Sequence, residues 1–536
     1  MSKFSDVILE HKYFNKELRE TSWDDVAKRV AREVVRPYLP SYENVIYQLI
    51  RDKKFMPGGR YLYAAGRKYN QVNNCFLFDV EDTKEAWADL NRRVTHGLST
   101  GAGIGVVYSK VRPYGSPIRG MGGIATGPLA LMQMVNEIGR HIQQGGSRRS
   151  ALWAGLHWNH ADMDRFIELK NWIPEVRALK EKDYNFPATM DGTNISCILD
   201  DDFFAAYNDP SHRDHGLSHS VYNRIIKQMC KTGEPGFSID VGINAGEHLR
   251  NACTEVTSKD DNDVCNLGSI NLANIDTLEE FDRVVSLGTL FLLCGTLYSA
   301  LPFDEIKRTR EKNRRLGLGL MGIHEWLLVR GKPYEQDAEL GTWLETYTKS
   351  DDYAAYWCNI LGISTPIKTR AIAPTGTISI IAETTSGIEP IFCTAFKRRY
   401  LKGDVWHAQY VIDATAKRLI EKGVDPYSIQ DAYSLDTEKR IAFQSFVQGY
   451  VDHSISSTIN MPAWGSERNN ENTLKTFGDT LMKYLPTLRG ITTYPDGARG
   501  GQPLSAVDYY EALAYEGTEV IEYGNENACV GGVCGV

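Results

Sequence analysis

The chain has 536 residues, with 68 acidic and 60 basic side chains, a formal net charge of −8, 42% hydrophobic and 10% aromatic residues. An acidic balance without a long basic run argues against nucleic-acid binding, and no apolar run approaches the roughly 20 residues that span a bilayer. The first residues lack a secretory signal, so we expect a cytoplasmic protein with no membrane partner, in which the ten cysteines are reduced.

The chain opens with apolar residues at helical spacing, such as Trp23, Val26 and Val30, which predict a short helical cap over residues 1–65. The first chemical landmark follows in residues 73–82, NNCFLFDVED. There Asn74 and Cys75 open an apolar run that predicts a buried strand.

A glycine-rich stretch carries eight glycines from residue 101 to residue 127. The alternate glycines at its start suggest a dinucleotide-binding loop. We reject that interpretation because Val106, Val107 and Tyr108 continue as a strand where the motif needs a helix.

Residues 127–142 then predict a helix with one apolar stripe. It is followed by Gly145 and Gly146 and then by a polar triplet, Ser147, Arg148 and Arg149. Two arginines on a glycine-hinged loop suit a phosphate or base contact, whereas the alternative is a solvated helix end whose arginines complement the helix dipole.

The span from residue 151 to residue 350 alternates apolar runs with helical patterns, which favours an α/β fold with a parallel sheet. Within it, His157 and His160 stand near Asp162 and Asp164. A metal site is conceivable there, but we favour a loop followed by a helix with aspartate in its first turn.

Residues 251–272 concentrate the most unusual chemistry. This segment holds Asn251, Cys253, Glu255 and Cys265, which are an amide, two thiols and a carboxylate. A thiol nucleophile would need a base, and the only close candidate is His248, whereas one-electron thiol chemistry needs none. The alternative is a surface loop with two incidental cysteines.

A second strong stretch, residues 373–390, contains three hydroxyls and a glycine in one turn. If a helix begins here, its N–H groups form an anion site suited to a phosphate, and the alternative is a simple helix cap. The residues of this predicted phosphate turn are Pro374, Thr375, Gly376, Thr377, Ile378 and Ser379.

The C-terminus ends in NENACVGGVCGV, with Cys529 and Cys534 among glycines. A zinc half-site would need a second pair of ligands nearby, so we favour a flexible redox dithiol.

In this order and spacing, Cys75, the 251–255 segment, Cys265, the phosphate turn and the terminal dithiol resemble the catalytic subunit of ribonucleotide reductase. The resemblance implies an α/β fold, namely a ten-stranded α/β barrel of two antiparallel halves, each of five parallel strands, with a central finger loop. It would comprise a catalytic barrel over residues 66–500 and a flexible tail over residues 501–536, without an ATP-cone in the cap, so ATP and dATP would exert no overall on/off control.

The resemblance also implies roles. Cys253 would become a thiyl radical that removes the ribose 3′ hydrogen, Glu255 would take the 3′-hydroxyl proton, and Asn251 would hydrogen-bond the sugar. Cys75 and Cys265 would supply two electrons and end as a disulfide, which Cys529 and Cys534 would reduce. Asn74 would contact the ribonucleotide, and the phosphate turn would hold its phosphates.

Further ligands and partners follow from the same resemblance. A deoxynucleotide or ATP would bind as specificity effector at Asp82, Arg119, Ser147, Arg148 and Arg149, and a thioredoxin- or glutaredoxin-type protein would recharge the tail. A homodimer is possible through the helix at 127–142.

The radical source is indicated by the stretch before the tail, where Tyr494 stands alone although class I enzymes carry two adjacent tyrosines. We therefore predict an adenosylcobalamin-dependent class II enzyme with no metal ligands of its own. The alternatives are a class I subunit that receives its radical from a metal-containing partner, and a non-catalytic nucleotide-binding protein.

Overall fold

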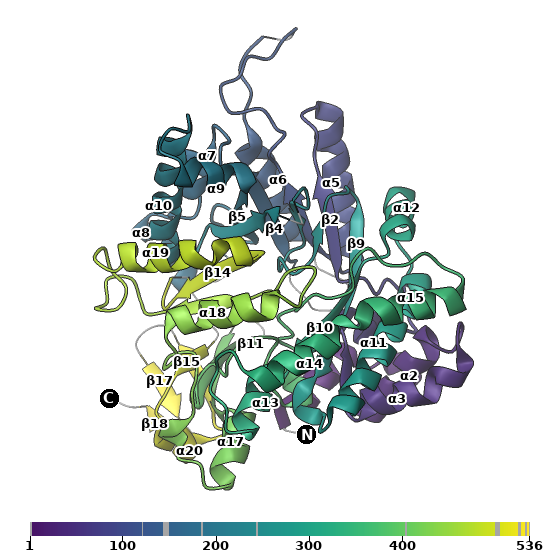
Figure 1. Cartoon of the computed structure of the whole chain (residues 1–536). Helices are drawn as coiled ribbons and strands as arrows, with labels where there is room; N and C mark the ends of the chain where they lie inside the picture. The colour runs from purple at the N-terminus through teal and green to yellow at the C-terminus, as the bar shows by residue number, and fades with distance from the viewer. Residues whose placement is uncertain are drawn as a thin grey trace.

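The structure is a computed structural model that describes residues 3–120, 122–142, 150–183, 186–242, 245–402, 405–498, 504–523, 527–530 and 533–534. It is a mixed α/β protein, as predicted, built around one large sheet with helices on its outer surface (Figure 1). A second, smaller sheet lies near the C-terminus.

The N-terminal region is largely helical, as expected for the cap. It contains α1 (Lys3–Ile8), η1 (Leu9–Tyr13), η2 (Lys16–Leu18), α2 (Trp23–Val34), η3 (Pro40–Tyr42), α3 (Glu43–Arg51) and α4 (Gly59–Ala64). In α2, Ser22 and Asp25 form a capping box, and Trp23, Val26 and Val30 face the core.

Five parallel strands form the first half of the large sheet. They are β2 (Cys75–Asp79), β3 (Gly103–Val107), β4 (Leu152–His157), β5 (Thr193–Asp200) and β6 (Gly236–Asp240). The segment after Gly101 is therefore a strand, which confirms the rejection of a dinucleotide-binding loop. Helices α5 (Lys84–Ser99), α6 (Pro128–His141), α7 (Met163–Ile167), α8 (Pro174–Lys182), α9 (Asp201–Asn208) and α10 (His215–Thr232) accompany this half.

The second half runs antiparallel to the first. Here β9 (Asp263–Asn271) pairs with β2 on one side and β14 (Gly490–Pro495) pairs with β6 on the other. In turn, β10 (Leu316–Met321) lies parallel to β9, and β13 (Thr458–Met461) lies parallel to β14.

The predicted division into two five-stranded halves is matched by named strands only in the first half. The sheet does contain ten strands, but one of them is β1 (Phe55–Pro57), which pairs antiparallel with β9 beyond the end of β2. Isolated bridges from Leu318 to Arg370 and from Ile372 to Ile455 connect β10 with the approach to β13. The sheet thereby curls round toward closure.

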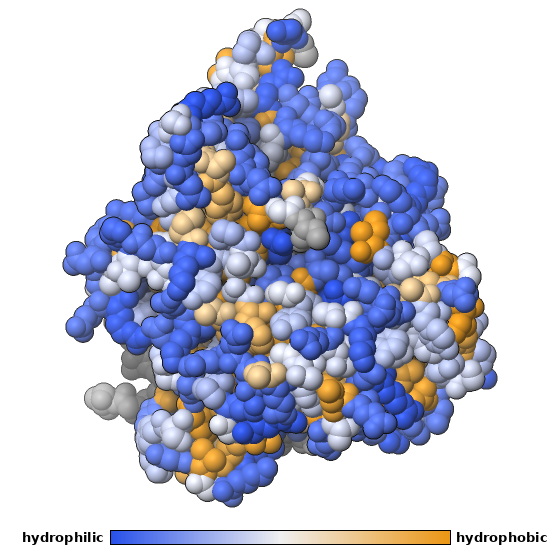
Figure 2. Space-filling model, in the orientation of Figure 1, coloured by the Kyte–Doolittle hydropathy of each residue, from blue (hydrophilic) through white to orange (hydrophobic). Residues whose placement is uncertain are grey.

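The second half contains α11 (Leu278–Tyr298), α12 (Asp304–Asn313), α13 (Ile323–Val329), α14 (Ala338–Thr348), α15 (Ser350–Leu361), α16 (Ile378–Ala382), α17 (Ala414–Glu421), α18 (Thr437–Gln448) and α19 (Leu474–Tyr484). Of these, α11 and α12 pack against β9, α11 also packs against β10, and α18 packs against β13. By length and composition α11 could cross a membrane, but 72% of its apolar window is buried inside the protein, as in a core helix. The face seen in Figure 2 is mainly hydrophilic, with apolar side chains in scattered patches.

The second sheet has six strands in the order β15, β11, β12, β16, β17 and β18. Its centre is the hairpin of β11 (Ala395–Lys402) and β12 (Val405–Ile412), to which β15 (Leu504–Ala506) and β16 (Glu519–Tyr523) pair. In the sequence between β15 and β16, α20 (Tyr509–Tyr515) buries Ala512 against Ala395 and Ile412. Within the predicted tail, the backbones of β15 and β16 thus pair with the central hairpin, and Ala512 of α20 packs on it.

Candidate active site

A hairpin presents the chemistry-bearing segment inside the curled sheet. Its strands, β7 (Leu249–Arg250) and β8 (Thr257–Ser258), pair antiparallel, and residues 251–256 form the loop between them, which we call the finger loop. The loop lies directly against β3, since a Cβ added at Gly105 would come within 1.7 Å of the Arg250 carbonyl oxygen. Only glycine allows this approach.

The finger loop is held by its own asparagine. The Asn251 Oδ1 accepts a hydrogen bond of 3.0 Å from the Val256 N–H, and the Asn251 carbonyl accepts one of 3.1 Å from the Thr254 N–H. Thr254 adopts φ of 67°, which is uncommon for a β-branched residue. The strained turn directly follows Cys253 and sets the direction of the loop tip.

The structure brings two predicted thiols together. Cys75 on β2 and Cys265 on β9 are direct partners in the antiparallel register, a pairing that places Cα atoms about 4.5–5.5 Å apart. This separation lies within the range that a disulfide bridges. Burial raises the pKa of both thiols well above the usual value, so both are protonated at neutral pH.

The side chains of Asn251 and Glu255 lie against Cys75. The Asn251 Nδ2 is 3.0 Å from the Cys75 Sγ, and the Cys75 Sγ is 3.9 Å from the Glu255 Oε1. Burial raises the pKa of Glu255 to about 7, although hydrogen bonds from Asn251 and Cys75 oppose the rise. The Glu255 Oε2 is buried and has no hydrogen-bond partner among the residues that the structure describes. Glu255 is thus a carboxyl that can gain or lose a proton near neutral pH.

Cys253 differs from the other two thiols because its side chain is exposed at the loop tip. It lines a cavity of about 330 Å³ together with Cys75, Asn251 and Glu255. A volume of this order suits a small-molecule ligand. The other walls come from the N-terminal region, from the starts of β2 and β3, from β9 and from the phosphate turn, and they include Tyr13, Gly58, Gly59, Asn74, Gly101, Gly103, Ala151, Ser269, Pro374, Thr375, Gly376, Thr377 and Ile378.

The phosphate turn reaches the cavity, but two of its three hydroxyls build the turn itself. The Thr375 Oγ1 accepts from the Gly387 N–H at 2.8 Å, and the Ser379 Oγ shares a hydrogen bond of 2.8 Å with Ser386. A short helix, α16, does begin at Ile378, with Thr377 as an N-cap residue that makes no side-chain cap. The turn therefore lines the cavity with Pro374, Thr375, Gly376, Thr377 and Ile378, whereas Ser379 is not part of the wall.

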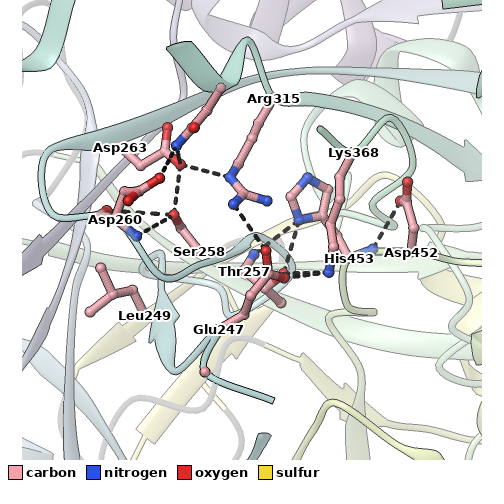
Figure 3. A network of polar contacts seen from close by, with 12 residues as sticks. Glu247, Leu249, Thr257, Ser258, Asp260, Asp263, Arg315, Lys368, Asp452 and His453 are labelled. Atoms are coloured by element: carbon pink, nitrogen blue, oxygen red, sulfur yellow. Dashed lines mark hydrogen bonds and ion pairs between the residues drawn. The ribbon is translucent and has the colours of Figure 1, made fainter. Parts of the chain in front are cut away.

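A network of buried charges anchors the base of the finger loop (Figure 3). Glu247, which precedes β7, pairs with Arg315 at 2.9 Å and also with Lys368. Arg315 also pairs with Asp263 at 2.6 Å, and both of these side chains are completely buried. Two cations thus match two carboxylates in a water-excluded site, an arrangement that tolerates no change of charge.

The other strand of the hairpin joins the same network. The Thr257 Oγ1 donates to Glu247 at 2.7 Å, and the Thr257 N–H donates to the His453 Nδ1 at 3.1 Å. Burial lowers the pKa of His453 well below its usual value, so His453 is neutral and accepts at Nδ1. In addition, the Ser258 Oγ donates to Asp263 at 2.6 Å. Both ends of the finger loop are therefore fastened to the second half of the sheet.

The predicted effector residues are not assembled into a site by the described contacts. Asp82 pairs with Arg112, and Arg119 is exposed on a hairpin-like loop before α6. Ser147, Arg148 and Arg149 lie outside the described residues.

The terminal cysteines fall in the last two strands, β17 (Asn527–Val530) and β18 (Val533–Cys534). The backbones of Cys529 and Cys534 are direct partners in this antiparallel pair. Their side chains lie outside what the structure describes.

The histidines considered as metal ligands have other partners. His157 contacts Asp200 at 2.9 Å, and the His160 Nε2 lies 2.8 Å from the Val111 carbonyl oxygen. In the part of the chain that the structure describes, no group of three potential metal ligands occurs.

Sequence reasoning missed Tyr13, Gly58 and Gly59 in the cavity wall and the charges beneath the finger loop. Tyr13 carried no local signal, because its role depends on where the cap packs. Arg315 and Asp263 could have been suspected only as charged residues beside apolar runs, a pattern that also occurs at strand ends on the surface.

Comparison with known proteins identifies the relatives of this chain. The family described as "Ribonucleotide reductase, barrel domain" matches residues 73–347 and 367–484, which is well over half of the chain. A "Vitamin B12-dependent ribonucleoside-diphosphate reductase" from Mycobacterium tuberculosis is 27% identical over 91% of this chain and 76% of its own length. One from Thermoplasma acidophilum is 28% identical over 90% of this chain and 68% of its own length. A "Ribonucleoside-diphosphate reductase large chain" from Cryptosporidium parvum is 26% identical over 54% of this chain and 42% of its own length.

Proposed function

This chain belongs to the ribonucleotide reductase barrel-domain family, whose members reduce ribonucleotides, and we propose that it does so through a thiyl radical on Cys253. The observation that carries the proposal is the grouping of the Cys75 and Cys253 thiols, the Asn251 amide and the Glu255 carboxyl around a single cavity, with Cys265 as the register partner of Cys75. Two thiols lie in disulfide register, and the third is exposed at the tip of the finger loop. Burial raises the pKa of the Cys75 and Cys265 thiols and keeps both protonated, which disfavours ionic thiol chemistry at these two residues.

In the proposed reaction, a Cys253 thiyl removes the hydrogen from C3′ of the ribose, and Glu255 accepts the proton of the 3′-hydroxyl. The Cys75 and Cys265 thiols then provide two electrons and two protons as the 2′-hydroxyl leaves as water, and they become a disulfide. Cys253 returns its hydrogen to C3′ at the end. Each turnover thus converts one ribonucleotide and two thiols into one deoxyribonucleotide, water and one disulfide.

Asn251 would serve as a positioning group in this reaction. Its Nδ2 contacts the Cys75 Sγ and its Oδ1 fixes the finger loop, so it links the reductant to the loop that carries Cys253 and Glu255. Asn74 and the phosphate turn would contact the remainder of the nucleotide. The Asn74 Oδ1 is buried at the cavity without a hydrogen-bond partner in the described part of the chain, which suits a ligand donor.

Adenosylcobalamin is the proposed radical source, as the names of the Mycobacterium and Thermoplasma relatives indicate. When bound, it would supply the one-electron oxidation that converts the Cys253 thiol to a thiyl. The residues fit such a cofactor because the Cys253 side chain is exposed and can be reached by it, whereas Cys75, Cys265 and Glu255 are buried. Asn194 on β5 is also exposed, and its side chain donates to the Ala252 carbonyl at 3.4 Å, so Cys253 and Asn194 would face the cofactor.

The test is product formation from a ribonucleotide with a small dithiol, with and without adenosylcobalamin. We expect turnover by this chain alone only when the cofactor is present. If no product forms under either condition, the class I alternative applies, in which a separate metal-containing subunit supplies the radical.

The pH profile tests the role of Glu255. Its pKa of about 7 means that the carboxyl is protonated below neutral pH and then cannot accept the 3′-hydroxyl proton. We therefore expect kcat/KM to fall as the pH drops through about 7. The control is Asp413, a second buried carboxyl, whose pKa is raised to about 6. Asp413→Asn removes this group and should leave the decrease of kcat/KM at low pH unchanged. A profile that is flat through neutrality would contradict the assignment.

We propose that Cys529 and Cys534 recharge the Cys75–Cys265 disulfide and are themselves reduced by a thioredoxin- or glutaredoxin-type protein. Cys529→Ser should then abolish turnover driven by thioredoxin and retain turnover driven by a small dithiol, which reaches the active site directly. Turnover is measured with each reductant in parallel. Equal loss with both reductants would exclude the shuttle.

Specificity control by a deoxynucleotide or ATP and assembly as a homodimer remain parts of the same proposal.

A further inference from the structure

The N-terminal segment contributes a wall to the active-site cavity, although it precedes the residues that match the family. Tyr13, at the end of η1, lines the cavity together with Gly58, Gly59 and the phosphate turn. Its side chain is only 5% exposed, so it is packed into this position rather than lying on the surface.

Two contacts fix the segment that carries Tyr13. The Ser5 Oγ donates to the Ile380 carbonyl at 2.8 Å, which fastens α1 to α16, the helix that follows the phosphate turn. The Arg29 guanidinium donates to the Tyr13 carbonyl at 3.2 Å and to the Leu62 carbonyl at 3.0 Å, which joins η1 to α4. Arg29 is itself buried and paired with Glu20 at 2.6 Å. The N-terminal segment that carries Tyr13 is thus fastened to both α4 and α16.

The Tyr13 hydroxyl lies against the start of α4. A Cβ added at Gly59 would approach the Tyr13 Oη to 3.0 Å, and one added at Gly58 would come within 2.9 Å of the Asn74 Oδ1. The two glycines therefore make room for two polar groups at the same end of the cavity. A phenol hydroxyl is a hydrogen-bond donor, and donors are what a phosphate requires.

We infer that the Tyr13 hydroxyl donates a hydrogen bond to a phosphate group of the ribonucleotide, so that the N-terminal segment completes the substrate site. Cys75, Cys253 and Glu255 line the part of the cavity where the ribose would react, whereas Tyr13 lies on the N-terminal segment that Ser5 fastens to α16, next to the phosphate turn. This inference rests on the proposed function for the nature of the ligand.

The experiment is equilibrium binding of CDP, CTP and cytidine to the full chain, measured by calorimetry without turnover. For Tyr13→Phe, which keeps the ring and removes only the hydroxyl, we expect CDP or CTP to bind about tenfold more weakly, because a hydrogen bond to a charged group is lost. Binding of cytidine, which has no phosphate, should be unchanged. The control is Tyr69→Phe, because Tyr69 is 77% exposed, and it should alter no affinity.

The outcomes separate this inference from the proposed function. If the unaltered chain binds neither CDP nor CTP, the proposed function fails. If the unaltered chain binds them and Tyr13→Phe binds them equally well, the role of Tyr13 is overturned. An equal loss for cytidine and for the nucleotides would also overturn it, because the hydroxyl would then contact the nucleoside. Thermal unfolding of Tyr13→Phe and Tyr69→Phe is measured beside that of the unaltered chain, so that a loss of binding is separated from a loss of folding.

Discussion

Replacing Cys253 by serine is expected to abolish ribonucleotide reduction while leaving nucleotide binding intact. Serine keeps the size and hydrogen-bonding capacity of the side chain at the exposed loop tip, but its hydroxyl does not yield a radical as a thiol does. We expect turnover to fall by at least about 1000-fold, which corresponds to about 4 kcal/mol in the activation barrier. The measurement is deoxyribonucleotide formation with a small dithiol, together with the affinity for CDP and CTP.

A matched control for this substitution is Cys358→Ser. Cys358 is a buried thiol on α15 that donates to the Ser364 carbonyl, a bond that a serine hydroxyl can also make, and it does not line the cavity. This variant should retain turnover. Full activity of Cys253→Ser would instead exclude the radical role and favour the non-catalytic nucleotide-binding alternative.

The largest effect on stability is expected from Arg315→Met, which removes the central cation of the network beneath the finger loop. Glu247 and Asp263 would keep their charges in a buried site with only Lys368 to balance them. Breaking a buried ion pair from one side costs about 3–5 kcal/mol, so we expect a loss of that order in the free energy of unfolding. Denaturant titration measures it.

Lys312→Met is the corresponding control, because Lys312 is a 63% exposed partner of Asp260, at the edge of the same region. Exposed pairs contribute about 0–1 kcal/mol, so this variant should unfold almost as the unaltered chain does. The double variant Arg315→Met with Asp263→Asn should recover part of the lost stability, because it restores the balance of buried charge. If Arg315→Met and Lys312→Met behaved alike, the network would have no structural role.

The buried charge network also affects activity, because it fixes the position of the finger loop. Thr257 and Ser258 of β8 hydrogen-bond to Glu247 and Asp263, so a shift of these carboxylates moves the strand that follows Glu255. A displacement of about 1 Å at a reacting group can cost 100-fold in rate. Arg315→Met protein that is still folded should therefore lose more in kcat than in nucleotide affinity.

The sequence alone determined the features that depend on short-range pattern. The apolar run after Cys75 predicted β2, and the valines after Gly105 predicted a strand instead of a dinucleotide-binding turn, because residues near in sequence decide local strand geometry. The same holds for the helix over residues 127–142, most of which is α6. The sequence also showed that the 251–255 segment carries an amide, a thiol and a carboxyl within five residues, since this needs only residue types and spacing.

Other properties were decided by the tertiary structure. Glu255 and Cys75 are 180 positions apart, and the contact between them, like the register of Cys75 with Cys265, arises only when β9 pairs antiparallel with β2. The raised pKa of Glu255 follows from burial, which no local pattern reports.

Three further features depended on packing between distant elements. Ser379 bonds to Ser386 instead of lining the cavity, β15 and β16 pair with the hairpin of β11 and β12, and Tyr13 lies in the cavity wall on a segment that docks on α16. Sequence pattern specifies which face of an element is buried, but not which distant element covers it, because that choice depends on contacts summed over the whole chain.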